Sequence, residues 1–303
     1  MIIAYLNDKK QEVFLSISRY NFAPFFNNAL VLDNSLSIDD ILSKGFEYTI
    51  IDRKKMDVGV KYKNIWKPFI QESITKELNF DVPTLYRAKR NLSILIQKLQ
   101  EILLFVEPSP ECLQTYSHKI KELLILACTE LETSFKFYKF GKNERTSDYV
   151  KILDFVDLSK YKVSLIGYTN AFKSCPFENW NSKEPTKSIP WYNAYTKIKH
   201  NSNEQFNLAT LENCLNAIIA DVIIFAIRYS IKSLYLDNDV CSNLFNTSFD
   251  FRIEDTFDFY IPLIECEPIY PYPEQPYYFY NGSIATQLVG TMKQLPYEER
   301  PIK

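Results

Sequence analysis

The chain has 303 residues, of which 46% are hydrophobic and 24% charged, with a formal net charge of −2 and a pI near 5.9. Hydrophobic residues are frequent enough to build a folded core, which excludes an intrinsically disordered chain. A protein whose whole surface binds a nucleic-acid backbone is usually basic, so nucleic-acid binding here requires a local basic patch.

The first 78 residues are predicted to form short strands. Met1–Leu6 and Glu12–Ser18 are two β-type runs joined by a polar turn, which predicts a hairpin. Phe46–Ile51 and Val58–Ile65 repeat this plan and predict a second hairpin. In the last of these runs apolar and polar residues alternate, which is typical of a strand with one buried face.

Helical periodicity begins after this β-rich region. Thr84–Val106 and Leu113–Tyr138 carry apolar residues at helical spacing, and Pro108 and Pro110 stand between them. Since proline cannot continue a helix, the sequence predicts two long amphipathic helices in an antiparallel hairpin. Asp148–Val156 is predicted to form a third, shorter helix.

The second half of the chain is predicted to contain a long loop, a central helix and an extended arm. Residues 159–190 show no clear periodicity, and loops of this length are often functional. Ala209–Tyr235 has a wide apolar stripe, which predicts a helix at the centre of a bundle. The pattern after Asp237 is that of strands, and residues 268–280 hold four prolines, which favours an extended Pro/Tyr-rich arm.

We therefore expect an α+β fold with a central helical bundle flanked by β-rich segments. The predicted regions are 1–78 (β-rich), 79–237 (helical bundle) and 238–303 (β-type and extended). The two β regions either pack together as one small sheet domain or stay separate, and the sequence leaves this open.

Few residues of the chain belong to known catalytic or metal-binding patterns. It has no Gly-rich phosphate loop and only two histidines, His118 and His200, so no metal and no cofactor are expected. The six cysteines are scattered, which is typical of reduced thiols in a cytoplasmic protein. The N-terminus is unlike a signal peptide, and no apolar run reaches the roughly 20 residues that a membrane span requires.

His200 is the better candidate for acid–base chemistry. It follows Lys197 and Lys199, whose charges would lower the pKa of a nearby imidazole. A neutral imidazole beside fixed cations is what a metal-independent ribonuclease requires, with His as the general base and the cations stabilising the transition state. The other interpretation is that these residues form the solvated end of a helix.

The segment Pro190-Trp191-Tyr192-Asn193-Ala194-Tyr195-Thr196-Lys197-Ile198-Lys199-His200-Asn201, with the helix that follows it, resembles a group of bacterial proteins. That group is similar to the HEPN (higher eukaryotes and prokaryotes nucleotide-binding) superfamily. The upstream segment Ala127–Glu132 fits the same pattern, and the resemblance covers roughly residues 80–236.

The resemblance implies an RNA-directed effector in bacterial phage defence, acting as a metal-independent ribonuclease with His200 as acid or base. Ribonuclease members of the superfamily carry an Arg shortly before the His, whereas here no Arg lies between Arg145 and Arg228. Either Lys197 and Lys199 supply the charge, or the protein is a non-catalytic HEPN-like module with a degenerate site. HEPN domains commonly pair, which implies a homodimer in either case.

The remaining candidate residues surround His200. Glu130 is expected to lean toward the helix seam, where it either orients His200 or pairs with a lysine on the rim, and Glu132 is expected to be solvated. Asn193 either caps the helix or contacts RNA. Tyr195 and Asn201 complete the set of expected RNA-contacting residues.

Overall fold

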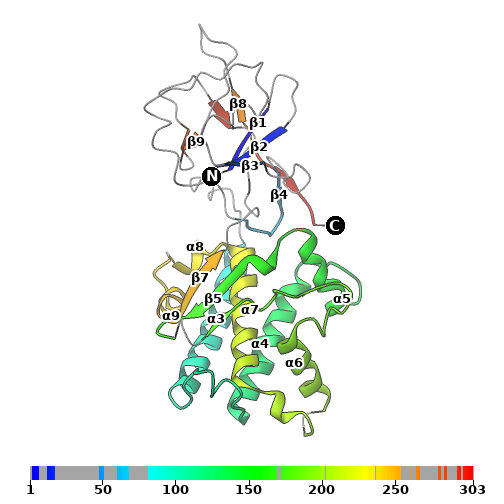
Figure 1. Ribbon diagram of the computed structural model, residues 1–303, viewed down its shortest axis with the longest axis vertical. Coiled ribbons are helices and arrows are strands. Elements are labelled where there is room, and N and C mark those ends of the chain that lie inside the picture. The colour runs from blue at the N-terminus through cyan, green and yellow to red at the C-terminus, as the bar shows by residue number, and fades with distance from the viewer. Residues whose placement is uncertain are drawn as a thin grey trace. The chain divides into compact units, whose positions relative to one another are not determined.

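The computed structural model describes residues 60–67, 81–168, 172–201, 203–235, 237–253, 260 and 296–302, together with the backbone of short strands elsewhere. The expected Pro/Tyr-rich arm lies almost wholly outside these residues. The fold is α+β, as expected, and the chain divides into two compact units (Figure 1). A sheet unit comprises residues 1–63, 67–77 and 257–301, and a helical unit comprises 64–66, 78–256 and 302–303.

The sheet unit combines strands from both ends of the chain. Strands β1 (Ile2–Leu6), β2 (Glu12–Ile17) and β3 (Tyr48–Ile50) form an antiparallel sheet in that order. Strand β4 (Val60–Tyr62) pairs in parallel with β12 (Glu298–Arg300), near the other end of the chain. The remaining antiparallel pairs are β8 (Ile264–Cys266) with β11 (Met292–Gln294) and β9 (Phe279–Tyr280) with β10 (Ser283–Ile284).

The first predicted hairpin is confirmed by the pairing of β1 with β2. The second is wrong, because β3 pairs with β2 and β4 pairs with β12. Alternation of apolar and polar residues identifies a strand, but it carries no information about which strand will be its partner.

Three long helices form the core of the helical unit. They are α3 (Val82–Leu103), α4 (His118–Lys136) and α7 (Leu211–Tyr229), and each contacts the other two. The hydroxyl of Ser117 caps α4 by accepting a hydrogen bond from the Ile120 amide at 3.2 Å. Helix α7 is buried along almost its whole length, which confirms that its wide apolar stripe marks a central helix.

Shorter elements surround these helices. Helix α6 (Pro190–His200) packs on α4 and α7 and leads into the 3-10 helix η5 (Phe206–Leu208). The third predicted helix is present as α5 (Thr146–Tyr149) followed by the 3-10 helix η3 (Val150–Asp154), and η4 (Leu158–Lys160) comes next. The motif segment Pro190–Asn201 therefore forms a helix that ends at His200.

Part of the predicted loop 159–190 forms a β-sheet. Strand β5 (Tyr161–Leu165) pairs with β6 (Lys173–Ser174) on one side and β7 (Phe249–Ile253) on the other, all antiparallel. In the sequence of β5 the apolar residues Tyr161, Val163 and Leu165 alternate with polar ones, and the structure buries all three. The strand is only five residues long, and its main partner β7 lies more than 80 positions away, so the alternation was easily missed.

The end of the helical unit also differs from expectation. The predicted helix 209–235 is broken at Ser230, whose φ of 71° is outside the helical region, and continues as α8 (Lys232–Tyr235). After Asp237 the chain forms a helix before it forms a strand, because Asp239 caps α9 (Val240–Ser248). Helix α9 packs on α3, so the helical unit extends to residue 256 and not to 237.

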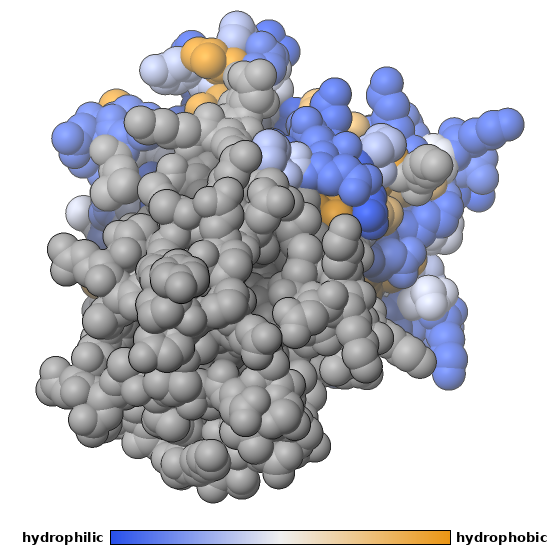
Figure 2. All heavy atoms as spheres, turned by 90° about the horizontal axis from the view of Figure 1, so that it is seen from above, coloured by the Kyte–Doolittle hydropathy of each residue, from blue (hydrophilic) through white to orange (hydrophobic). Residues whose placement is uncertain are grey.

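Among the described residues, no helix is both long enough and apolar enough to cross a membrane. The coloured side chains in Figure 2, which are the described ones on that face, are mostly hydrophilic. Hydrophobic side chains form only small patches among them.

Candidate functional site

Helix α6 carries most of the candidate residues, and its apolar face holds it in the helical unit. Trp191 and Ile198 are buried, and the Trp191 indole donates a hydrogen bond to the Pro176 carbonyl at 2.9 Å. The Trp191 ring also meets the ring of Phe177. Trp191 is therefore a packing residue that joins the preceding loop to the helix.

One carboxylate of α4, that of Glu132, binds several side chains of α6. The Tyr192 hydroxyl donates to Glu132 Oε1 at 2.8 Å, and Lys199 Nζ lies 3.7 Å from Glu132 Oε2. Lys199 also donates to the Tyr195 hydroxyl at 3.1 Å. Burial first, and the Glu132 charge after it, raise the pKa of Tyr192 above its usual value. These contacts hold α6 against α4.

This arrangement corrects two expectations. Glu132, which was expected to be solvated, is the carboxylate that faces α6. Tyr195, expected to contact RNA, is 2% exposed and cannot reach an external ligand in this structure.

Glu130 lies against a different helix. Its Oε2 accepts a hydrogen bond from Asn91 Nδ2 of α3 at 2.7 Å. Two positions along a helix are about 200° apart, so Glu130 and Glu132 point to different neighbours. The expectation that Glu130 orients His200 is therefore not met by this geometry.

His200 is the last residue of α6 and is exposed. It makes no hydrogen bond or ion pair with any residue that the structure describes, and Lys197 is exposed beside it. The expected arrangement of an imidazole held between lysines and a glutamate is thus absent from the described part of the chain.

The two asparagines lie at the end of α6 and within it. Asn201 follows α6 and donates from Nδ2 to Glu204 at 2.5 Å. Asn193 lies within the helix, half-buried, and does not cap it, because Ile189 occupies the N-cap position.

A cluster of rings and one lysine lies where η5 meets the start of α4. The Phe206 ring contacts His118 with a centroid distance of 4.7 Å and Tyr116 with one of 5.6 Å. Lys121 Nζ lies 5.4 Å from the same ring centroid. This Phe206 cluster, made of Tyr116, His118, Lys121 and Phe206, combines exposed aromatic surface with positive charge. Sequence reasoning missed it, since its members lie about 90 positions apart.

The end of α3 and the start of α4 enclose an apolar groove of about 560 Å³. Two of its lining side chains, Leu104 and Phe105, are 80% and 87% exposed. The signal in the sequence was five consecutive apolar residues, 102–106, which is more than one helix face can bury. We name it the α3–α4 groove; its apolar lining is Ile102, Leu104, Phe105, Val106 and Leu123, and its charged lining is Lys98, Glu101, Lys119 and Glu122.

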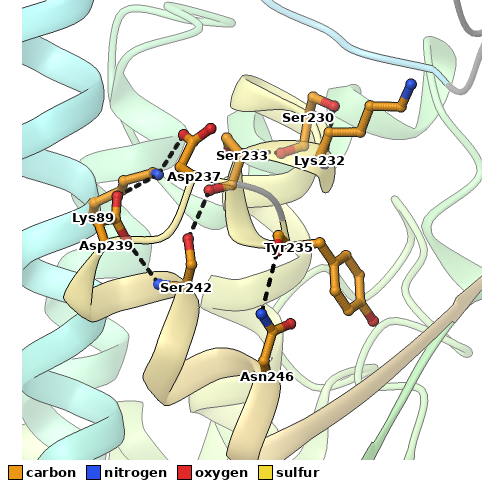
Figure 3. Close-up of polar contacts among 9 residues, drawn as sticks. All are labelled: Lys89, Ser230, Lys232, Ser233, Tyr235, Asp237, Asp239, Ser242 and Asn246. Atoms are coloured by element: carbon orange, nitrogen blue, oxygen red, sulfur yellow. Dashed lines mark hydrogen bonds and ion pairs between the residues drawn. The ribbon is translucent and has the colours of Figure 1, made fainter.

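A buried lysine links α3 to the start of α9 (Figure 3). Lys89 Nζ lies 2.6 Å from Asp237 Oδ2 and 2.7 Å from Asp239 Oδ2, and the lysine side chain is 4% exposed. Burial acts to lower the Lys89 pKa, but the two carboxylates outweigh it and raise that pKa. Asp239 also accepts a hydrogen bond from the Ser242 amide at 2.8 Å. With every charge paired, this Lys89 ion-pair cluster is a structural connection.

The described side chains contain no group of three or more His, Cys, Asp or Glu residues that could hold a metal ion. Comparison with known proteins gives no match to a protein family, to a curated protein or to a solved structure. The resemblance to the HEPN superfamily therefore rests on the sequence motif alone.

Proposed function

We propose that the helical unit is a non-catalytic, HEPN-like interaction module that binds a partner protein at the α3–α4 groove. The observation that supports this proposal best is the exposure of Leu104 and Phe105, 80% and 87%, in the lining of an apolar groove. Large apolar side chains gathered around a hollow are characteristic of protein-binding surfaces.

The surroundings of His200 support a binding role over a catalytic one. In known sites of this kind the general base is oriented by a neighbouring group that lies within hydrogen-bond reach of it. The exposed imidazole has no hydrogen-bond partner among the described residues, and no arginine lies between Arg145 and Arg228. A degenerate site on a retained scaffold accounts for both features.

Photo-cross-linking tests the binding role directly. A photo-reactive phenylalanine derivative replaces Phe105 in the whole protein inside cells, and the same derivative at Tyr86 serves as the control. Tyr86 is 63% exposed on α3 and does not line the groove. We expect a discrete cross-linked protein from position 105 only, identified by mass spectrometry. No product from position 105, or equal products from both positions, would contradict the proposal.

An RNA-directed effector remains the second candidate, and the Phe206 cluster favours it. Exposed rings next to cations are the usual elements of a single-strand binding surface. If the protein is a ribonuclease, purified protein will cleave total RNA, chelators will have no effect, and His200→Ala will abolish cleavage without unfolding the chain. If it is an interaction module, wild type and His200→Ala will both leave the RNA intact.

A further inference from the structure

We propose that residues 137–145, the loop between α4 and α5, bind an acidic segment of a partner protein (Figure 1). We name this segment the basic loop. The inference goes beyond the proposed function, because it concerns a different surface. The α3–α4 groove lies at the start of α4, the basic loop follows its end, and a helix of 19 residues spans roughly 28 Å.

Three exposed cations of the basic loop, Lys139, Lys142 and Arg145, make no ion pair with any residue that the structure describes. They lie within seven consecutive residues of a chain whose formal net charge is −2. The dipole of α4 does not account for them, because it acts within the last helical turn and α4 ends at Lys136. A local surplus of positive charge on an acidic protein is complementary to an acidic partner.

The two carboxylates between positions 137 and 148 are already paired with lysines outside the loop. Glu144 lies 3.7 Å from Lys136, and Asp148 lies 3.4 Å from Lys151. The nearby negative charge is therefore engaged, and the three cations of the loop remain available to an external ligand.

A fourth cation, Arg228 of α7, adjoins the first residue of the loop. Its guanidinium carbon lies 3.3 Å from the centroid of the Phe137 ring. Burial lowers the Arg228 pKa, and Asp81 acts on that pKa in the opposite direction without forming an ion pair. Among the described residues this guanidinium has no hydrogen-bond or ion-pair partner. A carboxylate would stabilise such a partly buried cation, since a guanidinium can bind it through two N–H groups.

The backbone of the basic loop is held in place by the rest of the helical unit. Lys139 and Glu144 have φ of 52° and 49°, in the left-handed region that residues other than glycine rarely occupy. The Phe140 carbonyl accepts a hydrogen bond from Lys151 Nζ at 3.0 Å, and the Glu144 carbonyl accepts one from the Tyr149 hydroxyl at 2.5 Å. A loop that is already ordered loses less conformational entropy on binding.

The scarcity of exposed apolar surface favours a protein segment over a membrane or an RNA strand. The structure describes the whole loop, and Phe137, 40% exposed, is its one exposed large apolar side chain. The Arg228 guanidinium lies over that ring. Membrane anchoring requires an apolar group that can insert, and single-strand binding requires free rings on which bases stack.

Fluorescence anisotropy of labelled peptides tests the proposal with the purified whole protein. The probe is a peptide of Asp-Glu repeats, and its control is a peptide of Asn-Gln repeats of the same length. We expect only the acidic peptide to bind, and more weakly as the salt concentration rises. Lys139→Gln combined with Lys142→Gln should weaken its binding by about 5-fold or more, because two exposed ion pairs with the peptide are lost.

The matched control variant is Lys173→Gln combined with Lys183→Gln. Both lysines are exposed and lie outside the loop, so the same charge is removed from other parts of the surface. This variant should bind the acidic peptide as the wild type does. Urea unfolding of both double variants should match the wild type, since none of the four lysines forms an ion pair with a described residue.

An oligouridine strand and mixed vesicles of phosphatidylcholine and phosphatidylserine test the other anionic partners. The proposal is overturned if the acidic peptide binds no better than the neutral one, or if the two double variants bind it equally. It is also overturned if the loop variant weakens binding of the RNA or the vesicles but not of the peptide. None of these outcomes affects the cross-linking result at Phe105, which concerns the α3–α4 groove.

Discussion

Asp221 is a carboxyl group in the middle of the most buried helix. It is 7% exposed, and its Oδ2 has no hydrogen-bond partner among the described residues. Burial, and to a lesser degree the nearby Glu130 charge, raise the Asp221 pKa well above its usual value. The folded protein therefore keeps this proton at pH values where the unfolded chain has lost it.

This difference in Asp221 protonation between the folded and unfolded chain makes the free energy of unfolding depend on pH. A raised carboxyl pKa means that the free energy of unfolding declines as the pH rises above about 4, by up to about 1.4 kcal/mol per pH unit, until the folded group also ionises. Asp221→Asn has no proton to lose, so we expect a smaller decline between about pH 4 and pH 8 in urea unfolding. Asp154→Asn, which alters an exposed carboxylate, is the control and should keep the wild-type slope. Equal slopes for Asp221→Asn and wild type would refute this assignment.

The chemistry of single residues could not predict which of Glu130 and Glu132 faces α6. Both are glutamates on α4, two positions apart, and no local pattern reports the angle at which α6 and α3 cross that helix. The crossing geometry makes Glu132 the partner of Tyr192 and Lys199, and Glu130 the partner of Asn91.

Between elements, the Lys89 ion-pair cluster is what joins α9 to α3 most specifically. Removing the ammonium leaves Asp237 and Asp239 without their shared counter-ion, and Asp239 also caps α9. We expect Lys89→Met to lower the free energy of unfolding by about 2–3 kcal/mol, because a partly buried pair that loses one partner is costly.

The matched comparison is Lys187→Met. Lys187 pairs with Glu184 at 3.2 Å, and both side chains are largely exposed, so its loss should cost less than about 1 kcal/mol. Equal effects in the two variants, measured by chemical denaturation, would show that the Lys89 cluster contributes no more than a surface ion pair.

The ends of the helices show how far local sequence determines where an element begins and ends. The capping residues Ser117 and Asp239 start α4 and α9, although periodicity placed the first start at Leu113 and predicted only strands after Asp237. The break at Ser230 has no such signal, because serine rarely adopts a φ of 71° and glycine is the residue expected there.

At the scale of the whole molecule, Ile65 and Trp66 precede the long helices by more than ten residues but belong to the helical unit. Ile65 and Trp66 are 1% and 4% exposed, and the Trp66 amide donates to the Ile227 carbonyl at 2.5 Å. We expect the segment 64–256 to unfold in one cooperative transition. The shorter segment 78–256 should be less stable by about 3 kcal/mol or more, since it loses two large core side chains.

Thermal and urea unfolding of both segments would measure this difference. If they prove equally stable, Ile65 and Trp66 do not form part of this core.

Local sequence was sufficient for the α+β class, the long helices α3, α4 and α7, and the central position of α7. These features follow from periodicity, capping and proline placement, which act over a few neighbouring residues. Tertiary packing was needed to establish that β4 pairs with β12, that Glu132 faces α6, and that Leu104 and Phe105 stay exposed in the lining of a groove. Each of these depends on segments far apart in the chain, and on angles between helices, which no short stretch of residues encodes.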